Sequence, residues 1–222
     1  MELVTVGVDI GQKHDPTALV VVEAVERPTG RVRRTGGGEA AAPETEAAFE
    51  ARFLERLPLG TAYPDVAARV AAVARGVLDR SGADPRAPGR RVTLVLDATG
   101  VGQPIADLLR AAVKDLPVRV TAATFTHGDR LSGRPGAREL TVGKAFLVSR
   151  LQALLQTGRL ALPAGHPEAA ALAQELLDYE IRVDPDGDAK FGAFRTGRHD
   201  DLVTALGLAV LTEPYRGVLL TT

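Results

Sequence analysis

The stretch ELVTVGVDIGQKHDPTALVVVEAVE, residues 2–26, carries the strongest fold signal in the sequence. Its first ten residues are mostly apolar and β-branched and end in Asp-Ile-Gly, which is typical of a strand that stops at a turn. The run from Thr17 to Glu26 is almost continuously apolar, as expected for a strand buried on both faces. Because only the short polar segment QKHDP separates the two runs, we predict an antiparallel hairpin with His14 and Asp15 as turn residues.

Strand and helix patterns follow this hairpin. Residues 27–46 are rich in Gly, Pro and Arg and predict a flexible loop or a hairpin tip, before a third strand that starts at Phe49. Apolar runs predict strands at 90–97 and 117–125, and a short hairpin is expected around Asp184–Asp188. The spacing of apolar residues predicts helices over 63–82, 103–115, 140–158 and 167–181, and a last helix that opens at Asp200.

This order of elements predicts the fold class. Strands come first, strands and helices then alternate, and the sequence has no internal repeat. We therefore expect one α/β domain over residues 1–222. Its mixed sheet would have antiparallel front strands followed by parallel strands, flanked by helices that join them.

Composition excludes several classes of protein. The chain carries 27 Lys and Arg against 28 Asp and Glu, so any surface that binds a polyanion must be local. It contains no cysteine, which excludes disulfides, thiolate zinc sites and thiol nucleophiles. No secretory signal precedes the first strand and no apolar run is long enough to span a bilayer. We therefore expect a cytoplasmic protein without a membrane partner.

Acidic residues stand where predicted elements start or stop. Asp9 ends the first strand, Asp97 ends the strand at 90–97, and Asp200 and Asp201 open the last helix. An acid at a helix start can simply cap free N–H groups. If the two strands are neighbours, however, their ends face the same ligand-binding edge and the acids would converge. Converging carboxylates repel one another without a cation, so the pattern favours a site for Mg²⁺ or Mn²⁺.

Three motifs in this order resemble the nuclease domain of phage terminase large subunits, which are DNA-packaging motors: VGVDIGQKHDPTALVVVE, VTLVLDATGVGQPIADLLR and GRHDDLVTALGLAV. The resemblance covers nearly the whole chain. It implies the ribonuclease H-like fold and a metal-dependent DNA endonuclease. Its catalytic metal ligands would be Asp9, Asp97, Asp200 and Asp201, holding two Mg²⁺ or Mn²⁺ ions. Such an ion pair can activate a water and stabilise the leaving oxygen of a phosphodiester.

The resemblance also implies partners. Double-stranded DNA would be bound largely without sequence specificity, and an ATPase domain, a small terminase subunit or a portal protein would direct the cleavage. A phage-encoded chain would act in the cytoplasm of its host cell. The sequence lacks a GxxxxGK[ST] phosphate loop, so we expect no ATPase domain within residues 1–222.

Basic residues near the predicted site are candidate DNA contacts. Those in and after the long polar loop are Arg130, Arg134, Arg138 and Lys144. Those that precede the aspartate pair are Lys190, Arg195 and Arg198. Local clusters of this kind suit phosphate contacts, and the few aromatic residues argue against base stacking. His199, next to the pair, is a candidate to orient a water or a phosphate.

Two alternatives use the same residues differently. The segments DIGQKHDPTA and DATGVG also suit an actin-like or sugar-kinase-type ATP-binding domain, although the chain is short for two such lobes. In a non-catalytic domain that docks DNA or a partner, the acids would serve only as caps and turn formers. ATP binding would favour the first alternative, and DNA binding without cleavage the second.

Overall fold

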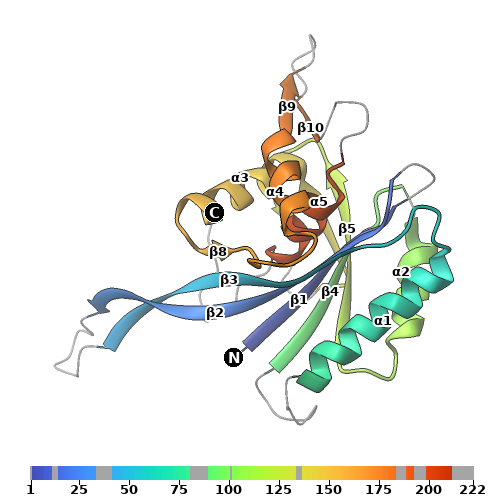
Figure 1. Cartoon of the computed structure of the whole chain (residues 1–222), viewed down its shortest axis with the longest axis horizontal. Helices are drawn as coiled ribbons and strands as arrows, with labels where there is room; N and C mark the ends of the chain where they lie inside the picture. The colour runs from blue at the N-terminus through green and yellow to red at the C-terminus, as the bar shows by residue number, and fades with distance from the viewer. Residues whose placement is uncertain are drawn as a thin grey trace.

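A twisted sheet runs through the molecule and helices cover both of its faces (Figure 1). The structure, a computed structural model, describes residues 2–11, 15–33, 42–80, 90–100, 102–133, 137–183, 189–192 and 199–211. In these residues the main sheet has eight strands, in the spatial order β6-β7-β5-β4-β1-β2-β3-β8. Their bounds are β1 (Glu2–Asp9), β2 (Ala18–Arg33), β3 (Ala42–Arg56), β4 (Arg90–Asp97), β5 (Val118–Thr126), β6 (Leu131–Ser132), β7 (Glu139–Gly143) and β8 (Leu160–Ala161).

The sheet is mixed, as predicted. β1, β2 and β3 are antiparallel neighbours, whereas β1, β4, β5 and β7 run parallel. The carboxyl ends of the four parallel strands therefore lie along one edge of the sheet. A separate hairpin pairs β9 (Glu180–Val183) with β10 (Ala189–Gly192), where a short hairpin was expected.

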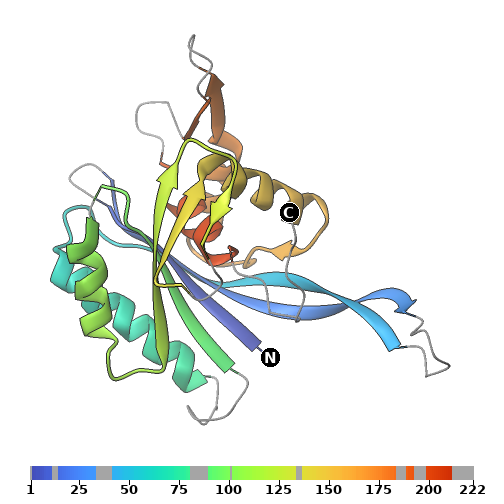
Figure 2. The same ribbon diagram turned by 180° about the vertical axis from the view of Figure 1, so that it is seen from behind.

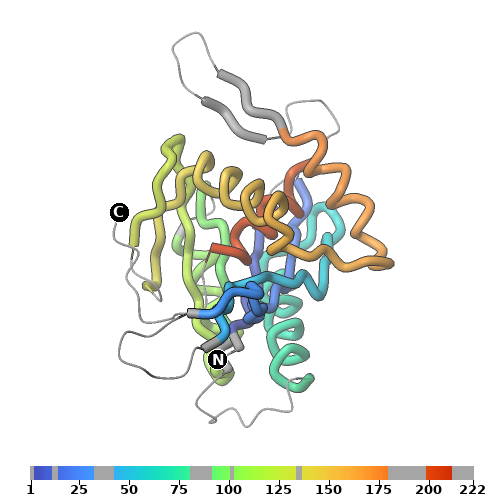
Figure 3. Tube along the Cα trace, turned by 90° about the vertical axis from the view of Figure 1, so that its left-hand side faces the viewer, coloured from blue at the N-terminus to red at the C-terminus, as the bar shows by residue number. Residues whose placement is uncertain are grey.

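The helices divide between the two faces (Figures 2 and 3). α1 (Tyr63–Arg80) and α2 (Gly102–Ala112) pack on one face through an apolar cluster with β1 and β4. α3 (Lys144–Gln156), α4 (Ala169–Asp178) and α5 (Asp201–Ala209) cover the other face. α5 lies against the centre of the sheet, and eight of its nine residues are buried. In the described part of the chain, no helix combines the length and the hydropathy needed to cross a bilayer.

The alternation of side chains along β1 and β4 places the acids on the α5 face. Val6 and Val8 point into the core under α1 and α2, as do Leu94 and Leu96 of β4. Residues of a strand alternate between its two faces, so Asp9 and Asp97 point the other way, toward α5.

Two segments differ from the sequence prediction. Residues 140–143, predicted as the start of a helix, form most of β7, and the helix begins only at Lys144. The β-branched pair Thr141 and Val142 completes the parallel sheet beside β5, and this pairing outweighs the helical periodicity of the residues that follow.

The described parts of segment 27–46 are strand. Residues 27–33 and 42–46 extend β2 and β3 into a long hairpin arm that leaves the body of the sheet (Figure 1). Residues 34–41 lie outside the described residues. The arm is held by the backbone pairing of β2 with β3, which leaves no apolar pattern in the sequence, and Arg27 also forms a salt bridge with Glu50 at 3.0 Å.

Candidate metal centre

Asp9 and Asp97 end two adjacent parallel strands. β1 and β4 pair in register up to Val8 and Leu96, and each aspartate is the next residue. The condition that the sequence left open, that these two strands be neighbours, is therefore met. Lys144 directly follows β7 and stands at the same edge of the sheet. The carboxyl edge thus brings together two aspartates, from β1 and β4, and one lysine, from the start of α3.

Helix α5 adds two further carboxylates. It approaches β1 so closely that a Cβ on Gly7 would lie 1.9 Å from the carbonyl oxygen of Ala205. Asp9 lies two residues beyond Gly7, about 7 Å along the strand. Asp201 lies four residues before Ala205, about 6 Å along the helix and on the same side. The close contact at Gly7 therefore sets the first turn of α5 beside the end of β1.

The four predicted acids influence one another electrostatically, although among the described residues Asp9 and Asp97 do not belong to a group of ligand atoms within 4.8 Å of one another. Burial raises the pKa of Asp9 well above its ordinary value, and the negative charges of Asp97, Asp201 and Asp200 raise it further, while Lys144 opposes them. Burial also raises the pKa of Asp97, against hydrogen bonds from Thr99 and the charge of Lys144. The cluster is thus strongly anionic when ionised, and a cation among the carboxylates would relieve the repulsion.

Asp97 also shapes the turn that follows its strand. Its Oδ1 accepts a hydrogen bond of 2.7 Å from the backbone N–H of Thr99, and the Thr99 hydroxyl in turn accepts one from Phe125 N–H. The turn and ligand roles considered for this residue are therefore compatible, because a carboxylate offers about four lone-pair sites and can accept these bonds and still bind a metal.

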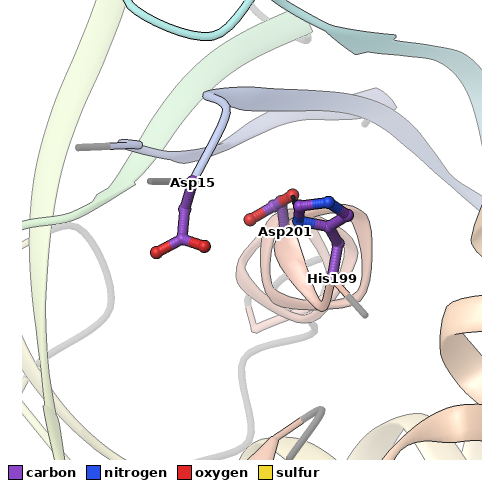
Figure 4. A group of neighbouring side chains, drawn as sticks. All are labelled: Asp15, His199 and Asp201. Carbon is purple, nitrogen blue, oxygen red and sulfur yellow. Dashed lines mark ion pairs between the residues drawn. The ribbon is translucent and has the colours of Figure 1, made fainter. Parts of the chain in front are cut away.

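A second group of potential ligands lies around Asp201. Ligand atoms of Asp15, His199 and Asp201 all lie within 4.8 Å of one another. Figure 4 shows His199 and Asp201 together at the start of α5, with Asp15 facing them from the β1–β2 connection. Asp15 is exposed, His199 is partly exposed and the Asp201 side chain is only 4% exposed.

This second group fits a divalent cation. Asp201 Oδ2 lies 3.6 Å from His199 Nδ1 and 3.6 Å from Arg56 Nε, and all three buried atoms lack a hydrogen-bond partner among the described residues. Such an unpartnered carboxylate oxygen is costly unless something else binds it. Two carboxylates and an imidazole form a donor set that suits a first-row divalent metal.

The pKa of Asp201 reflects these surroundings. Burial raises it to about 6. His199 and Arg56 lower it, while Asp200 and Asp15 raise it. A proton therefore occupies this carboxylate at mildly acidic pH, where it would compete with a metal.

The start of α5 is capped by a residue from another helix. Glu175, buried on α4, accepts hydrogen bonds from the backbone N–H groups of Leu202 (2.9 Å) and Val203 (3.1 Å). Asp200 occupies the N-cap position but makes no capping hydrogen bond with its side chain. The suggestion that one of the two aspartates caps the helix is therefore wrong, because Glu175 already holds those N–H groups.

Sequence reasoning missed four residues around this centre: Asp15, Arg56, Glu175 and Tyr179. Asp15 was interpreted only as a turn residue, although its position after the end of β1 placed it at the right edge of the sheet. Burial and the charges of Asp200 and Asp9 raise the pKa of Tyr179, so its phenol lies close to the cluster. Arg56 and Glu175 carry no local signal, because their partners are distant in the sequence.

A pocket of about 390 Å³ opens beside His199. It is lined by Pro16, Arg56, Leu57, Pro58, Leu59, Glu168 and His199. A group bound at Asp15, His199 and Asp201 would therefore lie next to a space large enough for part of a substrate.

The predicted basic residues fall into three sets. Arg130 and Arg138 are exposed on the connection between β5 and β7. Lys144 instead is partly buried beside the carboxylates, with its Nζ 5.7 Å from the centre of the Phe125 ring. Lys190 lies on strand β10, but the structure does not describe its side chain. Arg134, Arg195 and Arg198 lie outside the described residues.

Solved structures share this fold. The large terminase nuclease of the thermophilic phage G20c matches with a TM-score of 0.59 and 20% identity, over 96% of this chain and 83% of that one. The large terminase nuclease domain of Thermus phage P74-26 matches at 0.55 and 20%, over 94% and 78%. The human cytomegalovirus terminase nuclease domain matches at 0.54 and 16%, over 93% and 81%. No protein-family model matches the sequence, and no curated protein matches it significantly.

These matches establish the fold. The chain has the ribonuclease H-like fold of phage and viral terminase nuclease domains, as the three sequence motifs implied. Structures of the phage G20c nuclease hold magnesium or cobalt, and the cytomegalovirus domain was soaked with manganese.

Proposed function

We propose that this chain is a metal-dependent endonuclease that cleaves the phosphodiester backbone of DNA. The observation that carries the proposal is that Asp9 and Asp97 end adjacent parallel strands of the main sheet, and that the charges of Asp97, Asp200 and Asp201 all raise the pKa of Asp9. The Oδ2 atom of buried Asp201, which has no hydrogen-bond partner among the described residues, suits a metal ligand. The metals in the similar structures support the same chemistry.

Two groups of side chains would each bind one metal ion. One ion would be held by Asp9 and Asp97 with Asp200 or Asp201, and the other by Asp15, His199 and Asp201. When bound, a pair of such ions supplies an activated water and stabilises the leaving oxygen. Where Asp201 also serves as the third ligand of the first ion, its carboxylate would fix the relative positions of the two groups. Lys144 would contribute a positive charge for the phosphate that enters this edge.

The basic surface would bind the DNA backbone. Arg130 and Arg138 are exposed on the connection between β5 and β7 and can contact phosphates without reading bases. Arg134, Lys190, Arg195 and Arg198 remain candidates for this role from the sequence. An ATPase domain, a small terminase subunit and a portal protein are the partners we propose, because a nuclease without base specificity requires direction from elsewhere.

The test is cleavage of supercoiled plasmid by the full chain in Mn²⁺, Mg²⁺ or EDTA. We expect nicked and linear products that require metal and disappear in Asp97→Asn, which preserves the size of the side chain. Asp107→Asn is the matched control, because Asp107 lies exposed on α2 in a salt bridge with Arg110. If the well-folded chain cleaves with neither metal, the proposal is wrong. ATP binding would then favour the kinase-type alternative, and DNA binding alone the docking alternative.

A further inference from the structure

Arg56 contacts three acidic side chains near the first turn of α5. Arg56, the last residue of β3, donates a hydrogen bond to Glu175 Oε1 and lies 3.6 Å from Asp201 Oδ2 through its Nε. Glu168, which is partly exposed, lies 3.9 Å from the same guanidinium. Glu175 and Asp201 are both buried, and Arg56 is the cation that contacts both.

Glu175 connects this cluster to the backbone of α5. While Oε1 accepts from Arg56, Oε2 accepts from the first free N–H groups of the helix, at Leu202 and Val203. A carboxylate at this position satisfies the open donors and complements the positive end of the helix. The carboxylate of Asp201 is therefore not needed as a cap and is directed toward the cluster of ligands.

A need for stability alone does not explain this arrangement. A buried ion pair contributes little net stability compared with apolar residues of the same volume. The planar guanidinium, however, can bond Glu175 and face Asp201 at the same time, which fixes the two carboxylates relative to each other. Residues that hold metal ligands in place in this way strongly affect metal affinity.

We propose that Arg56 is a positioning residue: paired with Glu175, it fixes the start of α5 so that Asp201 is held in place to bind metal. The inference rests on the proposed function, because it takes Asp201 as a metal ligand. Arg56 also lines the pocket beside His199, but the positioning role does not require it to touch metal or DNA. It acts through the helix start and through its contact with the Asp201 carboxylate.

The experiment compares Arg56→Met and Arg56→Lys with Arg69→Met in the full chain. Arg69 is the matched control, because it pairs at 2.8 Å with Glu55, the neighbour of Arg56 on β3, and lies on α1, which packs on the opposite face of the sheet from α5. Mn²⁺ binding is measured by electron paramagnetic resonance, and plasmid cleavage gives kcat and KM. Circular dichroism and thermal melting verify the fold.

We expect Arg56→Met to weaken Mn²⁺ binding and to lower kcat by about tenfold or more, with little change in KM for plasmid. Arg56→Lys should restore part of the loss, because a lysine ammonium can pair with Glu175 but cannot bridge both acids. Arg69→Met should behave as the wild type. Should Arg56→Met fail to fold, Arg56→Lys and Glu175→Gln are used in its place. Each is expected to lower Mn²⁺ affinity and kcat in the same direction, but by less.

The outcomes separate this inference from the proposed function. A wild-type chain that neither binds Mn²⁺ nor cleaves DNA contradicts the proposed function itself. A wild-type chain that does both, with folded Arg56 variants of equal Mn²⁺ affinity and kcat, overturns only the positioning role. Arg56 variants that lose thermal stability but retain Mn²⁺ affinity also overturn it, since Arg56 would then serve structure alone.

Discussion

Gly7 of β1 and Ala205 of α5 are in direct backbone contact, and this contact brings the candidate metal ligands together. A Cβ at residue 7 would lie 1.9 Å from the Ala205 carbonyl oxygen and 2.8 Å from the Ala209 nitrogen. Both obstacles are backbone atoms of a buried helix, so they cannot move aside without moving α5. The absence of a side chain at one position of β1 therefore determines how near Asp201 lies to Asp9.

The first prediction concerns this contact. Gly7→Ala should displace α5, destabilise the fold by about 1–3 kcal/mol through overpacking, and abolish most metal-dependent cleavage. Urea unfolding and plasmid cleavage measure the two effects. Gly76→Ala is the control: its Cβ would meet only the flexible end of Arg80 at 3.5 Å, and alanine favours the helix. Unchanged cleavage in Gly7→Ala would show that the separation of α5 and β1 does not matter for the site.

The sheet could be predicted, and so could the positions of the four acids at strand ends and at the start of α5, because both depend on local signals. That these acids bind metal stays a prediction. The apolar runs that end in Asp9 and Asp97 mark strands, and parallel neighbours necessarily end at the same edge. The aspartates at 200 and 201 could be placed because a polar pair precedes a fully apolar helix. Short strands were less predictable: β8 consists of two residues that pair with Phe49 and Glu50.

The remainder of the site depends on contacts that no local pattern encodes. Arg56 and Glu175 are separated by 119 residues, and their pairing follows only from the packing of α4 and α5 over the sheet. Asp15 could be identified only once the fold placed the β1–β2 connection opposite the start of α5. The capping role went to Glu175 for the same reason, since capping rules consider only neighbours in sequence.

The second prediction is a pH dependence of stability without metal. The pKa of Asp201 is about 6 in the folded chain against 3.8 as the ordinary value, so the folded state binds more protons between these values. Stability should therefore fall as pH rises from about 4 to 6, by up to about 3 kcal/mol from this group. Asp9 shifts in the same direction and adds to the loss.

Thermal melting in EDTA across pH 4–8 tests this dependence. In Asp201→Asn the melting temperature should change less with pH than in the wild type. The variant should also be more stable than the wild type above pH 6, because no buried charge forms at residue 201. Mn²⁺ should stabilise the wild type more at pH 8 than at pH 5. Identical curves for the wild type and Asp201→Asn in EDTA would contradict the prediction.

The third prediction concerns the choice of metal. His199 supplies a nitrogen donor within the Asp15 and Asp201 group, and nitrogen ligands favour Mn²⁺ over Mg²⁺, which prefers oxygen. His199→Gln should therefore lower cleavage in Mn²⁺ more than in Mg²⁺. His127→Gln, at an exposed position after β5, is the control. An equal loss with both metals would indicate that His199 acts on water or phosphate and not as a ligand.

The last prediction separates DNA binding from chemistry. Arg130 and Arg138 are exposed on the connection between β5 and β7, and the contact of Arg130 with Asp129 is long, at 3.9 Å, so both positive charges can contact phosphates. The double variant Arg130→Gln/Arg138→Gln should raise KM for plasmid, leave Mn²⁺ affinity unchanged, and reduce the slope of log affinity against log salt by about 1 for each lost contact. Arg119→Gln is the matched control, because Arg119 is exposed near the amino end of β5, at the opposite edge of the sheet. Binding titrations at several salt concentrations measure the slope. If Arg119→Gln weakens binding as much as the double variant does, the DNA contacts extend over the opposite edge, and the basic connection between β5 and β7 is not the surface that holds the duplex.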